Sequence, residues 1–122
     1  MSKSEHRIQN EIRLALSEYG IVLRLNSGKF WQGRRVWSEE FRQYVLTDLR
    51  PVQGLPEGTA DLLFLGDGKN IAFVECKTLK GAAREKQKRF LEFMRGFGIK
   101  ADIARSVEDA LKIIGEEKDD TL

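Results

Sequence analysis

Two runs of strand-forming residues on either side of a glycine-containing turn constrain the fold of this chain more than any other part of its sequence. Residues 60–65 and 71–77 are strongly apolar, and residues 66–70 (Gly-Asp-Gly-Lys-Asn) separate them. Apolar runs flanking such a turn indicate a β-hairpin. Because the second run is apolar at almost every position, we expect it to be covered on both faces of a sheet.

The remaining periodic segments predict helices and strands that complete this sheet. Apolar residues at helical spacing indicate helices, and β-branched and other strand-forming residues indicate strands. Gly20 and Gly115 are expected to end the first and last helices. The order α-β-β-β-α-β-α indicates an α/β fold with a mixed central sheet flanked by helices. The helices are expected at residues 4–19, 82–96 and 106–114, and the other strands at 21–26 and 99–104.

A carboxylate in the second hairpin strand is the first sign of chemistry. Glu75 lies among apolar residues, where a charge must be paired or bound to a metal. Lys77 follows two residues later and therefore projects from the same face. Asp61 lies on the first strand, and its position relative to Glu75 depends on the turn. A three-residue turn at 66–68 makes Asp61 a diagonal neighbour of Glu75, and a three-residue turn at 67–69 places the two residues directly opposite each other. A two-residue turn separates them onto opposite faces, so the functional interpretation requires an odd-length turn.

Two polar residues on the predicted helices extend this cluster. Glu11 lies beside Ile12, at the edge of the buried stripe of the first helix, so we expect it to reach a site on the sheet. Gln87 falls within the apolar stripe of the second helix. Its amide needs hydrogen-bond partners there, and a site on the sheet would supply them.

These residue types together indicate phosphodiester hydrolysis. Carboxylate ligands without histidine favour Mg²⁺ or Mn²⁺ over zinc. Such a cation polarises a phosphoryl oxygen and generates hydroxide near neutral pH, and a lysine beside it stabilises developing negative charge. A structural interpretation stays open for each residue: a turn-capping Asp61, an ion pair of Glu75 with Lys77, and an ion pair of Glu11 with Arg7.

The charge distribution is compatible with a nucleic-acid partner. The net charge is only +2, but the chain is net basic up to residue 101 and net acidic beyond it. A basic body attracts a phosphate backbone, although ordinary solvated surface charge explains the same distribution. We expect a single domain over residues 1–115, followed by an acidic flexible tail over residues 116–122.

Further features predict a cytoplasmic protein. No apolar run is long enough to span a membrane, and the polar N-terminus lacks the apolar segment of a secretory signal. The single cysteine, Cys76, cannot form an internal disulfide, which fits a reducing compartment.

The quoted residues resemble a known nuclease motif. Residues 58–61 (Gly-Thr-Ala-Asp), followed by residues 75–77 (Glu-Cys-Lys), resemble the motif of PD-(D/E)XK nucleases. The order of elements is similar to their restriction-endonuclease-like αβββαβ core. With Gln87, Glu11 and the short chain, the pattern is similar to the virus-type replication-repair nuclease (VRR-NUC) family. One departure is Ala60, which stands where the motif has proline.

The resemblance implies roles for the residues of the cluster and Mg²⁺ or Mn²⁺ as the cofactor. Asp61, Glu75, Glu11 and the main-chain carbonyl of Cys76 would be metal ligands, Lys77 the catalytic lysine and Gln87 a supporting residue.

The resemblance also implies a structure-selective DNA endonuclease that acts as a homodimer in a bacterial or phage-infected cell. Branched DNA such as a Holliday junction is the expected substrate, because a two-fold pair of sites cuts two strands symmetrically. A nuclease of flaps or duplexes and a non-catalytic DNA-binding module are the alternatives.

Two basic stretches are predicted to contact this DNA. Residues 27–58 mix aromatic side chains with arginines, and we expect loops and short β pieces there. Within them, the aromatic and basic residues 29–50 are expected to form a dimer surface, a DNA contact or both. Core packing under a long loop is the alternative for Trp31 and Trp37. The other stretch follows the hairpin, where a solvated helix face is the alternative. The predicted phosphate contacts are Arg34 and Arg35 in the first stretch and Lys80, Arg84, Lys86, Lys88 and Arg89 in the second.

Overall fold

Four strands form one mixed sheet in the computed structural model, which describes residues 3–117. The strands lie in the order β1-β4-β5-β6, with β1 antiparallel to β4, β4 antiparallel to β5, and β5 parallel to β6. Helices flank this sheet, so the predicted α/β fold with a restriction-endonuclease-like core is confirmed. The elements are α1 (Glu5–Leu16), β1 (Gly20–Arg24), β4 (Leu62–Gly66), β5 (Ile71–Cys76), α2 (Glu85–Gly96), β6 (Lys100–Ala104) and α3 (Val107–Ile114).

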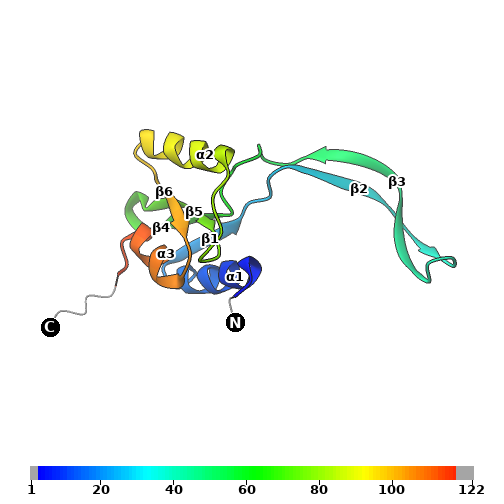
Figure 1. Cartoon of the computed structure of the whole chain (residues 1–122), viewed down its shortest axis with the longest axis horizontal. Coiled ribbons are helices and arrows are strands. Elements are labelled where there is room, and N and C mark those ends of the chain that lie inside the picture. The colour runs from blue at the N-terminus through cyan, green and yellow to red at the C-terminus, as the bar shows by residue number, and fades with distance from the viewer. Residues whose placement is uncertain (1–2, 118–122) are drawn as a thin grey trace.

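Apolar residues on both faces of the sheet hold the helices in place. One cluster packs α1 and α3 against β4 and β5, and it includes Ile12, Phe64 and Val74. A second cluster packs Leu91 of α2 against the opposite face, on the other side of the sheet from α1 and α3 (Figure 1). Because successive strand residues point to opposite faces, Val74 faces α1 and α3, whereas Glu75 faces α2.

The hairpin of β4 and β5 has the later of the two odd-length turns. Leu65 pairs with Ile71, and the turn is the short 3₁₀ segment η1 (Asp67–Lys69). Gly68 adopts a left-handed conformation with a φ of +60°, which glycine reaches without steric cost. Continuing this register by one residue places Asp61 directly opposite Glu75, on the same face of the sheet.

The prediction of loops and short β pieces for residues 27–58 is wrong for most of that stretch. Strands β2 (Lys29–Ser38) and β3 (Gln43–Gln53) form a long antiparallel hairpin with a bulge between Gln32 and Arg34, and it projects from the body of the protein (Figure 1). No residue of either strand is fully buried, so the alternation of buried and exposed residues that reveals a strand is missing. Trp31 and Trp37 are exposed, which excludes core packing for both.

Gly20 does not end the first helix by a left-handed turn. Helix α1 ends at Leu16, and Gly20 is the first residue of β1, opposite Gly66. A β-carbon added at Gly20 would lie 2.3 Å from the carbonyl oxygen of Leu65, so this glycine is required by the close approach of two strands. Gly115 does cap α3 in a left-handed conformation.

The predicted acidic tail and the predicted absence of membrane spans can each be compared with the structure. Most of the predicted acidic tail, residues 118–122, lies outside the described residues. Within residues 3–117, none of the helices has the length and apolar character needed to cross a membrane.

Candidate active site

Asp61 is fixed in place by hydrogen bonds on both sides. Its backbone carbonyl accepts from the backbone N–H of Leu25 at 2.8 Å, and its Oδ2 accepts from the backbone N–H of Cys76 at 2.8 Å. The side chain therefore takes a position that a backbone carbonyl fills elsewhere in an antiparallel ladder. Within the part of the chain that the structure describes, its second carboxylate oxygen accepts no hydrogen bond, which leaves that oxygen available to a ligand.

Glu75 is a buried carboxylate that is stabilised only in part. Only 1% of its surface is exposed, and its Oε2 has no hydrogen-bond partner among the described residues. Burial raises the pKa of Glu75 to about 8; the nearby Asp61 carboxylate adds to this rise, and the positive charge of Lys77 opposes it. An anion with an unpartnered buried oxygen is costly, so the site favours either a proton or a cation at this position.

Gln87 holds Glu75 in a defined orientation. The Oε1 of Gln87 accepts from the backbone N–H of Arg84 at 2.8 Å, and its Nε2 donates to Glu75 Oε1 at 3.1 Å. Because an N–H can only donate, the bond from Arg84 fixes which end of the amide faces the carboxylate. Gln87 therefore caps the first turn of α2 and orients Glu75 at the same time, as the need for partners in its apolar stripe had suggested.

Lys77 lies beside this carboxylate at the end of β5. Its Nζ is 3.9 Å from Glu75 Oε1, and the residue is 6% exposed. The separation is longer than a hydrogen bond, so the ammonium group stabilises the negative charge of Glu75 without donating a hydrogen bond to it.

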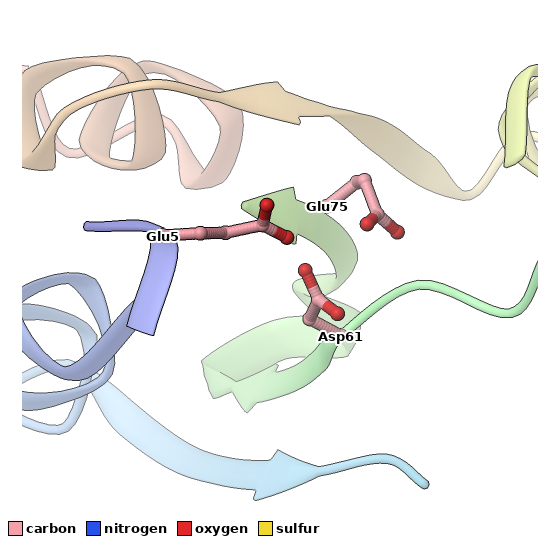
Figure 2. A group of neighbouring side chains, drawn as sticks. All are labelled: Glu5, Asp61 and Glu75. Atoms are coloured by element: carbon pink, nitrogen blue, oxygen red, sulfur yellow. The ribbon is translucent and has the colours of Figure 1, made fainter. Parts of the chain in front are cut away.

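Glu5 completes the acidic cluster in the position that was predicted for Glu11. One carboxylate oxygen each from Glu5, Asp61 and Glu75 lie within 4.8 Å of one another, and Figure 2 shows the carboxyl groups of the three side chains close together. Glu5 comes from the first turn of α1, whereas Asp61 and Glu75 come from the sheet.

Glu11 lies outside this cluster, and the expectation that it reaches the sheet is corrected. Its carboxylate binds Lys3 Nζ at 2.8 Å and Arg7 Nε at 3.3 Å, with 35% of its side chain exposed. The hydrogen bond from Lys3 lowers the pKa of Glu11. The ion pair with Arg7 is the structural alternative that the sequence had left open.

A helical signal identifies Glu5 once the buried residues of α1 are known. Ile8 and Ile12 are buried, and Glu5 lies three and seven residues before them, on the same stripe. Glu11 is one residue away from Ile12, which rotates it by about 100° around the helix axis.

Cys76 takes part in the site through its backbone. Its thiol is buried in the opposite core cluster, and burial raises the pKa of this thiol. The thiol is therefore neutral and faces away from the carboxylates, while the N–H of the same residue binds Asp61.

The predicted phosphate contacts lie on two separate surfaces. Those after β5 are exposed, whereas Arg34 and Arg35 lie on the projecting strand β2. Several already have partners within the chain: Lys86 with Glu57 (2.7 Å), Arg89 with Glu85 (3.3 Å), Arg34 with Asp48 (3.2 Å), and Arg35 over the ring of Tyr44 (3.8 Å). Exposed ion pairs of this kind are weak, so they leave the side chains available to another anion.

The donor set fits a divalent cation that prefers oxygen ligands. Three carboxylates converge, and one buried oxygen has no partner. Hard cations bind carboxylate and carbonyl oxygens, and a cation here would remove the cost of ionising Glu75. Asp61, directly before β4, and Glu75, on β5, lie opposite each other at the two central strands. The mixed sheet and the position of the cluster on it are typical of the restriction-endonuclease-like class of proteins.

Comparison with known families identifies the branch of this class. The family model of the VRR-NUC domain matches residues 3–108, so the chain belongs to the VRR-NUC family, as the motif predicted. It is accordingly a nuclease domain, and its substrate is DNA. No curated protein matches the chain.

Proposed function

We propose that this nuclease is a Mg²⁺- or Mn²⁺-dependent DNA endonuclease whose active site is the cluster around Glu75. The observation that carries the proposal is the unpartnered Oε2 of a buried carboxylate, which lies beside the carboxylates of Asp61 and Glu5. A site that only bound DNA would gain nothing from this buried negative charge, since DNA is itself an anion.

Each residue of the site has a separable role in phosphodiester hydrolysis. Asp61, Glu75 and Glu5, with the main-chain carbonyl of Cys76, would hold the cation, which supplies polarisation of the phosphoryl oxygen and an activated water. Lys77 places a positive charge where negative charge develops on the phosphate in the transition state. Gln87 keeps Glu75 in one orientation, which lowers the cost of reorganisation during the reaction.

Cleavage assays on defined DNA structures test this proposal. Purified protein is incubated with labelled four-way junction, flap, duplex and single-stranded DNA, each with Mg²⁺, Mn²⁺ or EDTA. Metal-dependent cutting that Asp61→Ala abolishes supports the endonuclease, and selective cutting of the junction supports a resolvase of branched DNA. Cutting of flaps or duplex alone assigns the other substrate class. Tight binding without any cutting contradicts the proposal and favours a DNA-binding module.

Glu5→Gln is expected to slow cleavage by about 10- to 100-fold, since the variant removes one charge from the cation's surroundings. Glu11→Gln on the same helix is the matched control and is expected to cleave at nearly the wild-type rate, because Glu11 pairs with Lys3 and Arg7 instead. Single-turnover rates on one DNA substrate measure both. A large loss in Glu11→Gln with none in Glu5→Gln would return the role to Glu11.

We further propose that the β2–β3 hairpin joins two copies of the chain. A two-stranded hairpin alone is at best marginally stable in water, and this one exposes many large apolar side chains. Tryptophan, tyrosine and arginine, which dominate the energetics of protein interfaces, all occur on it. The exposed large residues are Phe30, Trp31, Trp37, Phe41, Tyr44, Leu46, Leu49 and Val52.

One face of the hairpin is suited to pack on a copy of itself. Trp37 lies opposite Tyr44, and Arg35 lies opposite Leu46 on the same face, with the Trp37 and Tyr44 rings edge to face at 5.2 Å. The tip carries two acidic residues and one basic residue, Glu39, Glu40 and Arg42, whereas Lys29 and Arg50 lie toward the base. In an antiparallel two-fold pair, each acidic tip approaches the basic base of the other hairpin.

The double variant Trp37→Ser, Leu46→Ser is therefore expected to convert a dimer to a folded monomer. Both side chains are about half exposed, so their loss removes intersubunit contacts with little effect on the body. Analytical ultracentrifugation measures the mass. Phe93→Ser, an exposed aromatic residue on α2, is the control and is expected to stay dimeric. A wild-type monomer would exclude this role for the hairpin and leave the catalytic proposal untouched.

A further inference from the structure

Arg105 binds the loop that follows Lys77. It lies directly after β6, where its backbone N–H donates to Asp109 Oδ2 at 2.9 Å. Its Nη1 donates to the carbonyl oxygens of Thr78 and Gly81 and lies 3.5 Å from that of Leu79. No ion pair of Arg105 occurs within the part of the chain that the structure describes, so the backbone carbonyls are the acceptors that its guanidinium uses.

The sheet alone does not hold this loop. The backbone N–H of Lys77 donates to the carbonyl of Ala104 at 3.1 Å, which extends the pairing of β5 with β6 by one residue. Beyond it, Leu79 and Lys80 are exposed, so their side chains do not anchor the loop by packing. Within the loop, Thr78 Oγ1 accepts from the Gly81 N–H at 3.0 Å. The connection from the loop to the rest of the domain therefore runs largely through Arg105.

The loop also forms one wall of a cleft. A cavity of about 660 Å³ lies between the first turns of α1 and the start of α3. Thr78, Leu79 and Lys80 line it together with Arg105. A shift of the loop would therefore change both the cleft and the direction in which the chain leaves Lys77.

We propose that Arg105 is a positioning residue of the nuclease, which fixes the loop at residues 78–81 so that Lys77 is directed into the acidic cluster. This inference rests on the proposed catalytic function. The lysine side chain has four rotatable bonds, and its Nζ has no hydrogen bond to Glu75 at 3.9 Å, so its position depends on its backbone. A misplacement of about 1 Å at a reacting group can cost about 100-fold in rate.

Arg105→Met tests this role, because methionine keeps an apolar stem and removes the hydrogen-bond donors. We expect kcat to fall by about 10- to 100-fold, with the Kd for DNA and its salt dependence unchanged. Hydrogen exchange at residues 78–81 is expected to accelerate. Arg105→Lys retains a donor and is expected to recover part of kcat. Arg95→Met is the matched control, since Arg95 also donates to a backbone carbonyl, that of Ala101, and is expected to keep the wild-type kcat.

Three results would overturn the proposal. Faster exchange in the loop with an unchanged kcat would make Arg105 a purely structural residue. Weaker DNA binding with a smaller salt slope would make it a direct phosphate contact. Unchanged exchange would show that Arg105 does not hold the loop. If the wild-type protein cleaves no DNA at all, the catalytic proposal fails instead, and the exchange measurement still decides whether Arg105 holds the loop.

Discussion

Glu75→Gln is expected to abolish DNA cleavage while the metal-free protein stays at least as stable as the wild type. The substitution keeps the shape of the side chain and removes the charge on which cation binding depends. Loss of one essential electrostatic group at a reacting centre lowers the rate by about 100-fold or more. The stability follows from burial: the wild-type carboxylate has an unpartnered Oε2, and its ionised form is disfavoured in the folded protein, as its raised pKa indicates.

Two measurements separate these effects. Cleavage is followed at saturating Mg²⁺ or Mn²⁺, and thermal unfolding is followed in EDTA. Glu85→Gln is a suitable control, because Glu85 is exposed and forms an ion pair with Arg89; it is expected to retain full activity. If Glu75→Gln cleaves DNA normally, Glu75 is not a ligand. If it unfolds at a much lower temperature in EDTA, the carboxylate contributes to the core and its assignment to catalysis loses support.

The sequence predicts the relation of Asp61, Glu75 and Lys77 because it follows from the two-residue repeat of strands. Residues two apart on a strand share a face, and an odd-length turn keeps the opposite strand in phase. It does not decide between the two odd-length registers, because Gly68 lies within the turn in both and accepts a left-handed conformation in either.

The first helix shows where sequence patterns reach their limit. Both Glu5 and Glu11 lie near the apolar stripe. Which of the two reaches the site depends on which end of the helix meets the sheet. Tertiary packing determines which end this is. Ile8 and Ile12 are buried in the core, and Glu5 continues their stripe beyond the edge of the core. A helical pattern predicts a face but not how far the sheet extends beneath it.

The sequence does not predict the projecting hairpin, for a different physical reason. Strand patterns are recognised because one face is buried in the same chain, and β2 and β3 bury neither. Arginines and a glycine interrupt the aromatic residues, which makes the stretch similar to a polar loop. A stretch rich in strand-forming residues without a buried face is better explained by a surface that contacts another molecule.

The metal-free protein is expected to lose stability as the pH rises from about 4.5 to about 8. In the folded state the pKa of Glu75 is raised from 4.5 to about 8, so in this range the folded protein holds a proton that the unfolded chain has released. The state that binds more protons is favoured at low pH, and the contribution of Glu75 is therefore complete below pH 4.5 and lost as the pH passes 8. We expect the Tm in EDTA to fall by about 5 °C or more across this range.

Glu75→Gln isolates this contribution, because the variant cannot titrate at this position and other groups remain the same. The difference between the wild-type and variant Tm values, measured in EDTA from pH 5 to 8.5, is expected to favour the variant increasingly with pH. Addition of Mn²⁺ is expected to stabilise the wild type most at the alkaline end, since a cation and a proton compete for the same carboxylate. A wild-type Tm that rises with pH relative to the variant would mean that Glu75 is stabilised as an anion without metal, and that neither a proton nor a cation is needed at this site.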